Sequence, residues 1–178
     1  QPRSRGLGDV YKRQTKYGTR QGISAMTILE SIVMLYERTM DKKYLYFAEH
    51  LVKVSEQNNK LRLMGNMLEN GSVVNSGDGK AYQLMANLLG YLSLYRCTGK
   101  EKYLTTVLNA WEQIKDKHIL VSGGPWSRHT DYNGNKECFA HKDAFHPEKI
   151  FVEGCSDATW VQLNICLLYT SDAADDLL

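Results

Sequence analysis

Hydrophobic positions follow a helical period in four stretches of the chain. In each stretch apolar residues recur at spacings of three and four, which places them on one face of a helix. The four predicted faces are Leu29, Ile32, Val33 and Tyr36; Tyr44, Ala48, Leu51 and Val52; Ala81, Leu84, Met85, Leu88, Leu92 and Tyr95; and Tyr103, Val107, Leu108, Trp111 and Ile114. We therefore predict four amphipathic helices.

The predicted helices are joined in pairs by short connections. Met40-Asp41 separates the first two helices and Gly99-Lys100 the next two, so each pair is expected to be antiparallel. Gly99 suits the left-handed residue that ends a helix. Ser156 is a good N-cap for a fifth helix, which is predicted to run through Trp160 and Leu163.

The pairs also repeat in sequence, which indicates stacked helical hairpins. The two copies are Leu35-Tyr36-Glu37-Arg38-Thr39 with Lys43-Tyr44-Leu45, and Leu94-Tyr95-Arg96-Cys97-Thr98 with Lys102-Tyr103-Leu104. The predicted fold class is all-α.

Two long connections interrupt the helices, at residues 58–78 and 117–152. Turn signals such as Asn70-Gly71, Ser76-Gly77 and Gly123-Gly124-Pro125 mark them. In a ring of hairpins such connections gather at one mouth, where a rigid scaffold holds functional side chains. The polar and aromatic candidates there are Trp126, His129, Tyr132, Glu137, His141 and His146.

Composition excludes several classes of function. The chain has 22 Lys and Arg against 20 Asp and Glu, a net charge of +2, which gives no basis for binding nucleic acid or an anionic membrane. Its apolar runs are too short to span a bilayer. The first residue is Gln, so the sequence does not indicate a compartment.

The two ends of the chain lack the character of the rest. Residues 1–14 show no periodicity, and residues 166–178 break off a helical pattern; both resemble translated adapter DNA. We expect the native part to be residues 15–165, a fragment of one catalytic domain. Discounting Cys166 leaves Cys97, Cys138 and Cys155, an odd number that favours free thiols or metal ligands over disulfides.

Glu153-Gly154-Cys155 is the strongest chemical signal. Ile150 and Phe151 favour an extended chain, in which residues two apart point the same way, so Glu153 and Cys155 are predicted to converge. Helix entry at Ser156 is expected to favour the Cys155 thiolate through the helix dipole. Zinc accepts such sulfur and oxygen donors. The alternative is that Cys155 is a small packed residue.

The other candidates are weaker. Glu137 lies sixteen positions before Glu153 and can serve as a proton donor if burial or negative charge raises its pKa. His129 can bind a metal or a sugar, and Trp126 and Tyr132 can stack on a sugar ring. Asp78 precedes the third helix and is expected near the mouth. For each of them the alternative is an ordinary loop residue.

Taken together, these residues resemble glycoside hydrolase family 127, the β-L-arabinofuranosidase-like proteins. The resemblance covers about Tyr17 to Asn164. It rests on Leu94-Tyr95-Arg96-Cys97-Thr98-Gly99, Gly79-Lys80-Ala81-Tyr82, Val121-Ser122-Gly123-Gly124 and Val152-Glu153-Gly154-Cys155 in this order.

The resemblance implies a partial (α/α)6 barrel of antiparallel hairpins with long loops at one mouth. It implies retaining hydrolysis of a terminal glycoside, with a carbohydrate as the partner. It also implies zinc held by one Glu and three Cys, of which Glu153 and Cys155 match two. Glu137 matches the acid/base. Asp78, Trp126, His129 and Tyr132 are the expected substrate contacts, although Asp78 stands where relatives often have His.

The resemblance places the remaining cysteines, including the nucleophile, beyond Leu178. We therefore expect the chain as given to be inactive. Two other hypotheses remain open. One is a six-hairpin-barrel hydrolase or isomerase that uses carboxylates and histidines without zinc, and the other is a non-catalytic helical-repeat binding protein.

Overall fold

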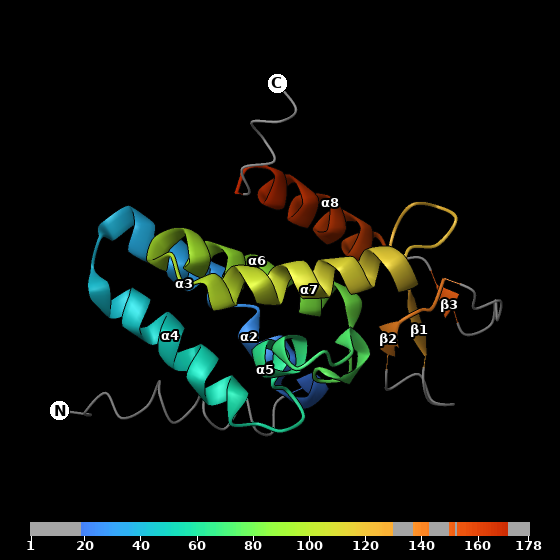
Figure 1. Cartoon of the computed structure of the whole chain (residues 1–178), viewed down its shortest axis with the longest axis horizontal. Helices are drawn as coiled ribbons and strands as arrows, with labels where there is room; N and C mark the ends of the chain where they lie inside the picture. The colour runs from blue at the N-terminus through green and yellow to red at the C-terminus, as the bar shows by residue number, and fades with distance from the viewer. Residues whose placement is uncertain (1–18, 130–136, 143–149, 152, 171–178) are drawn as a thin grey trace.

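The chain folds as a partial helical barrel of the all-α class, which confirms the predicted fold class (Figure 1). The computed structural model describes residues 19–129, 137–142, 150–151 and 153–170 of the 178. Across these ranges no helix is both long and apolar enough to cross a membrane.

Two long helical hairpins and a final helix make up most of the structure. The α-helices are α2 Ile23–Met26, α3 Leu29–Thr39, α4 Lys42–Glu56, α5 Leu63–Leu68, α6 Ala81–Thr98, α7 Glu101–Lys117 and α8 Gly154–Leu168. The 3-10 helices are η1 Thr19–Gly22 and η2 Val73–Asn75. The strands are β1 Ser127–His129, β2 Glu137–Phe139 and β3 Ile150–Phe151.

The predicted hairpins are confirmed as α3 with α4 and α6 with α7, and the helices of each pair pack on each other. Met40 ends α3 in the left-handed region at φ 55°, and the Asp41 carboxylate then caps α4 by accepting from the backbone N–H of Lys43 at 3.0 Å. Gly99 ends α6 at φ 65°, as its sequence position predicts.

Helix α6 is the centre of the core, because α3, α7 and α8 all pack against it. The sequence predicts one apolar face for α6, whereas the structure buries Leu89, Tyr91 and Leu94 as well. A helix enclosed by three neighbours is apolar nearly all round, so its hydrophobic pattern no longer marks a single face.

Gly90 sets the close approach of α6 to α3. A Cβ added there would lie 2.8 Å from Leu29 Cβ and 3.0 Å from the backbone N of Glu30. Because backbone atoms cannot rotate away, we expect Gly90→Val to lower the free energy of unfolding by about 1–3 kcal/mol. Urea denaturation measures this. Gly154→Val is the control, since nothing lies within 4 Å of its added Cβ. An equal loss in both variants would contradict the packing argument.

Two details differ from the sequence prediction. Residues 58–78 were expected to be a loop but contain α5 and η2. These helices are too short for a helical period of hydrophobic residues to be visible in the sequence. Leu108 was placed on the inner face of α7 and is 39% exposed, because the buried side of this helix is carried by Val107, Ala110 and Ile114.

A small antiparallel sheet forms in the second long connection, in the strand order β2-β1-β3. This confirms the extended chain predicted at Ile150-Phe151, whereas β1 and β2 were not predicted. The backbone N–H of Phe139 in β2 donates to the carbonyl of Gly79 at 3.0 Å. The two long connections therefore meet at the start of α6, as expected for loops gathered at one mouth.

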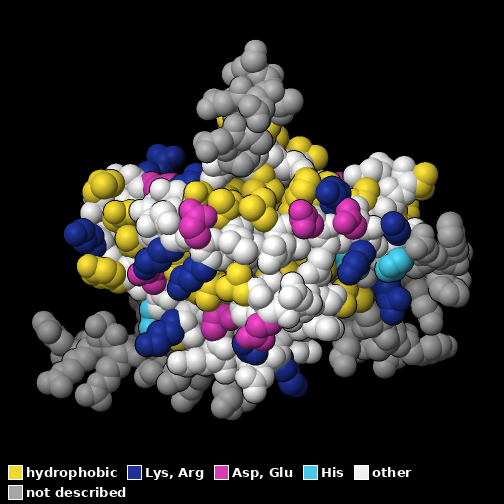
Figure 2. Space-filling model, in the orientation of Figure 1, with side chains coloured by type: hydrophobic (Ala, Val, Ile, Leu, Met, Phe, Trp, Pro, Cys, Tyr) yellow, Lys and Arg dark blue, Asp and Glu magenta, His cyan; other side chains and the backbone are white. Residues whose placement is uncertain are grey.

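Helix α8 continues past Ile165, and Leu167 packs in the core. The interpretation of residues 166–178 as artificial stays a prediction. The opposite face of α8 exposes Val161, Ile165 and Leu168. Figure 2 shows hydrophobic side chains gathered on this part of the surface.

Candidate active site

The Glu153 carboxylate lies where α6, β1 and α8 meet. Its Oε1 accepts a hydrogen bond from Lys80 Nζ at 2.6 Å. Its Oε2 accepts from Ser127 Oγ at 2.6 Å and from Ser156 Oγ at 3.1 Å. Three segments far apart in the sequence therefore converge on one carboxylate.

Lys80 is a buried cation, with 5% of its side chain exposed. It stands at the N-cap position of α6, and its ammonium lies 5.4 Å from the ring centre of Tyr82 and 5.3 Å from that of Phe151. Aromatic faces attract a desolvated ammonium, but a buried charge also requires an opposite charge. Glu153, with 16% of its side chain exposed, supplies that charge.

The surroundings of Glu153 keep its carboxylate ionised. Burial alone would raise its pKa, but hydrogen bonds from Lys80 and Ser127, together with the charge of Lys80, leave the pKa below its usual value. The side chain is therefore an anion well suited to bind a cation.

Cys155 contacts Glu153, although the local structure differs from the prediction. Helix α8 begins at Gly154 rather than at Ser156, and Glu153 is its N-cap with an extended backbone. Because the cap residue is not yet helical, its carboxylate stays near enough to the Cys155 thiol to lower its own pKa slightly and to raise the pKa of the thiol. The predicted convergence of the two side chains thus occurs across a helix start.

The pKa of the Cys155 thiol moves in the direction opposite to the one expected from the helix dipole. Partial burial, together with the charge of Glu153 and hydrogen bonding to it, raises the pKa of the thiol.

The donor chemistry of this pair fits zinc. One carboxylate and one thiol stand two residues apart, and both are donor types that zinc accepts. Within the described ranges, however, no group of three or more His, Cys, Asp or Glu residues could hold a metal. Glu153 and Cys155 as metal ligands stay a prediction.

Glu137 is linked to Glu153 through the sheet. It begins β2 and pairs with His129 of β1, in the register that also pairs Ser127 with Phe139. Ser127, at the other end of β1, donates to Glu153. The backbone thus places Glu137 opposite His129, on the two strands next to the Glu153 carboxylate. The structure describes the backbone of Glu137 and His129 but not their side chains.

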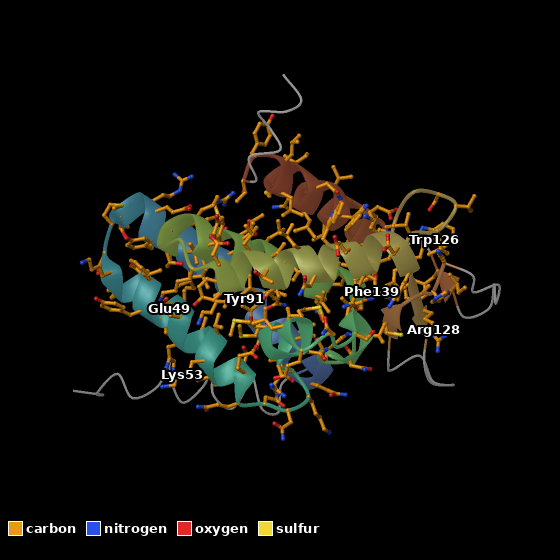
Figure 3. All side chains as sticks on the ribbon, viewed as in Figure 1. Glu49, Lys53, Tyr91, Trp126, Arg128 and Phe139 are labelled. Atoms are coloured by element: carbon orange, nitrogen blue, oxygen red, sulfur yellow. The ribbon has the colours of Figure 1, made fainter. Side chains whose placement is uncertain are left out.

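Trp126 immediately precedes β1, and Figure 3 shows it at the same end of the molecule as Arg128 and Phe139. Its indole N–H is buried and has no hydrogen-bond partner among the described residues. The predicted substrate role of Trp126 stays a prediction.

Asp78 lies close to this region but is already engaged. Its carboxylate is 7% exposed, pairs with Arg20 at 3.0 Å and accepts from the backbone N–H of Lys80 at 3.3 Å. Asp78 therefore supports the start of α6, and a substrate role stays a prediction. Tyr132 and His146 lie outside the described residues.

Lys80 and Ser127 contact the Glu153 carboxylate but were not among the candidates predicted from the sequence. Lys80 entered only as part of a family-like motif, and Ser127 not at all. A lysine just before an apolar helix gives a faint signal, but its partner is 73 positions away, and no local pattern shows that.

His118 packs against the end of β2. It is 5% exposed, its ring nitrogen Nδ1 lies 3.0 Å from the carbonyl of Ala140, and its ring packs on Phe139. Burial is the main cause that lowers its pKa, and the nearby His141 and Lys117 lower it further.

The lowered pKa of His118 predicts a loss of stability in acid. The unfolded chain takes up the proton near pH 6.5 and the folded chain only at lower pH, so stability falls as the pH drops below about 6.5, by at most about 1.4 kcal/mol per unit. Urea denaturation between pH 7.5 and 5 measures this. His118→Asn keeps a donor for Ala140 and should flatten the profile, whereas His50→Gln, at an exposed site, should not. An unchanged slope in His118→Asn would contradict the assignment.

Comparison with known protein families identifies the domain. A family model described as the catalytic domain of β-L-arabinofuranosidase, glycoside hydrolase family 127, matches residues 9–175. The chain belongs to this family of glycoside hydrolase domains. Searches of curated proteins and of solved structures found no match.

Proposed function

We propose that this domain hydrolyses terminal β-L-arabinofuranosides with retention of configuration, using a zinc-thiolate centre. The contact between Glu153 and Cys155 carries this proposal, because it brings an anionic oxygen and a sulfur to one point in a glycosidase domain. Glu153 and Cys155 would hold zinc together with further thiolates. The ion, when bound, supplies Lewis acidity that favours thiolate over thiol.

Glu137 is the proposed acid/base. Its carboxyl group gives a proton to the glycosidic oxygen as the bond from that oxygen to the anomeric carbon breaks and the nucleophile bonds to that carbon. The resulting carboxylate then takes a proton from the water that displaces the nucleophile from the same carbon, which restores the acid. The pairing of β1 with β2 supports this role, since it places Glu137 beside the strand whose Ser127 hydroxyl donates to Glu153.

Trp126, His129, Tyr132 and Asp78 are the proposed sugar contacts. Trp126 is supported by its place directly before β1, whose Ser127 hydroxyl donates to the Glu153 carboxylate. The nucleophile is assigned to none of these residues. In this proposal Cys155 serves as a ligand, and another thiolate of the centre attacks the sugar.

Zinc binding tests the proposed centre. In a form of the protein that binds zinc, we expect Cys155→Ser and Glu153→Gln each to weaken zinc binding by at least about tenfold in a titration against a chromophoric chelator, because each removes a ligand. Cys97→Ser is the matched control: Cys97 is a free thiol on α6 whose Sγ lies 3.5 Å from Glu37 of α3. Equal affinity in all variants would overturn the zinc centre.

The same variants separate this proposal from a zinc-free carboxylate mechanism. That mechanism predicts that Cys155→Ser leaves hydrolysis of the family's substrates nearly unchanged. The zinc-thiolate mechanism predicts a large loss, since the centre would lose a ligand.

A further inference from the structure

We propose that two copies of this chain associate head to tail through the outer faces of α3 and α8. The outer face of α8 in each copy packs on the outer face of α3 in the other, so the same contact forms twice. The proposal concerns the helical scaffold and is independent of the proposed zinc centre.

Helices α3 and α6 run parallel. Gly90 of α6 lies beside Leu29 at the start of α3, since a Cβ added to Gly90 would be 2.8 Å from Leu29 Cβ. Two turns further on, Cys97 of α6 lies beside Glu37 of α3, with 3.5 Å between Sγ and Oε1. Both helices therefore advance in the same direction.

Helix α8 continues this arrangement on another side of α6 (Figure 1). Lys80, the N-cap residue of α6, pairs with Glu153, the N-cap residue of α8, so these two helices begin at the same end. Helices α3 and α8 each pack on α6 rather than on each other. The three form a row with α3 and α8 at its ends, which we call the inner row.

The α8 end of the inner row has an uncovered apolar face. Val161, Ile165 and Leu168 are 57%, 50% and 40% exposed, and their spacing of four and three places them on one side of the helix. Leu163 and Leu167 are buried on the opposite side. Residues 158–170 contain no Asp, Glu, Lys or Arg, so covering this face desolvates no charge on α8.

The α3 end of the row has a matching face. Met34 and Leu35 are 43% and 41% exposed, on the side of α3 away from the buried Leu29 and Val33. Arg38, one turn further along, is exposed beside them. An apolar centre with a polar edge is the usual make-up of a protein interface.

The inner row explains why a second copy is the partner that fits. Helix α6 is apolar nearly all round and has a neighbour on each side, whereas α8 has the same character and lacks a neighbour on its outer side. A two-fold axis parallel to the row places α8 of each copy on α3 of the other. Three inner helices from each copy then form a closed ring of six, in which both outer faces are covered.

The mass of the whole chain in solution tests this arrangement. We expect sedimentation equilibrium to give about twice the 20.3 kDa of one chain. Ile165→Glu on α8 and Met34→Glu on α3 should each reduce the mass to that of one chain, because each puts a charge into both contacts. Val161→Glu and Leu35→Glu are second variants of the two faces. Circular dichroism checks that each variant is folded.

Mixing the two variants separates head-to-tail association from a pairing of α8 with α8. A copy with Ile165→Glu keeps its α3 face, and a copy with Met34→Glu keeps its α8 face. An equal mixture should therefore regain a dimer through one intact contact. Tyr46→Glu is the control, since Tyr46 is 63% exposed on α4, and it should stay dimeric.

Three results would overturn the proposal. The first is a single-chain mass for the unmodified protein. The second is a dimer that persists in both Met34→Glu and Leu35→Glu, which would show that α8 pairs with α8. The third is a mass above that of two chains, which would show that the contacts do not close.

Discussion

Glu153→Ala is expected to lower the free energy of unfolding by about 3–5 kcal/mol, the largest stability effect predicted for this chain. The substitution takes the carboxylate away from Lys80, whose side chain is only 5% exposed. It also removes the acceptor of the Ser127 and Ser156 hydroxyls at the junction of β1 with α8. Chemical denaturation monitored by circular dichroism measures the loss.

A double variant separates the ion pair from general damage. Lys80→Met combined with Glu153→Leu replaces both charges by apolar groups, which is often nearly neutral at a buried pair. We expect the double variant to be more stable than Glu153→Ala alone. Glu49→Ala removes the acid of the more exposed Lys100–Glu49 pair and should cost much less. A small loss in the free energy of unfolding of Glu153→Ala would contradict the view that this carboxylate stabilises the junction of α6, β1 and α8.

Glu137→Gln is expected to lower hydrolysis by about 10²–10⁴-fold in a form of the protein that cleaves β-L-arabinofuranosides. The amide has nearly the shape of the acid but cannot give up a proton to the leaving oxygen. The loss in the bond-breaking step should be larger for an alkyl leaving group than for a nitrophenolate, because nitrophenolate departs without protonation. Steady-state kinetics on the two substrates measure this difference.

Glu112→Gln is the control for Glu137, since Glu112 is an exposed glutamate on α7. It should leave both rates unchanged. If Glu137→Gln slowed the two substrates equally, Glu137 would not act as the acid, and a role in binding or folding would remain.

The helical part of the fold could be predicted because local patterns determine it. The spacing of Leu29 and Val33 identifies α3, and Gly99 marks the end of α6 through its backbone freedom. The same reasoning failed for Leu89 and Tyr91. Their burial depends on how many neighbours α6 has, which the sequence of α6 does not contain.

The candidate site was predictable only in part. The spacing of Glu153 and Cys155 predicted that their side chains lie near each other. The sequence pattern nevertheless placed the start of α8 near Ser156 rather than at Gly154, and it predicted a lowered pKa for the Cys155 thiol where the structure raises it. Lys80 and Ser127 were missed, because their contacts with Glu153 span 73 and 26 positions of the chain. Contacts of this kind follow from packing, which local patterns cannot supply.

The absorption spectrum of the chain loaded with cobalt(II) in place of zinc tests the central claim most directly. A bond between Cys155 sulfur and cobalt gives a thiolate-to-metal charge-transfer band that oxygen and nitrogen ligands do not produce. In a form of the protein that binds cobalt, we predict that this band is present in the unmodified protein and in Cys97→Ser and is weaker in Cys155→Ser by the contribution of one thiolate. A spectrum without the band, or a band of equal intensity in Cys155→Ser, would contradict a metal centre built on Glu153 and Cys155.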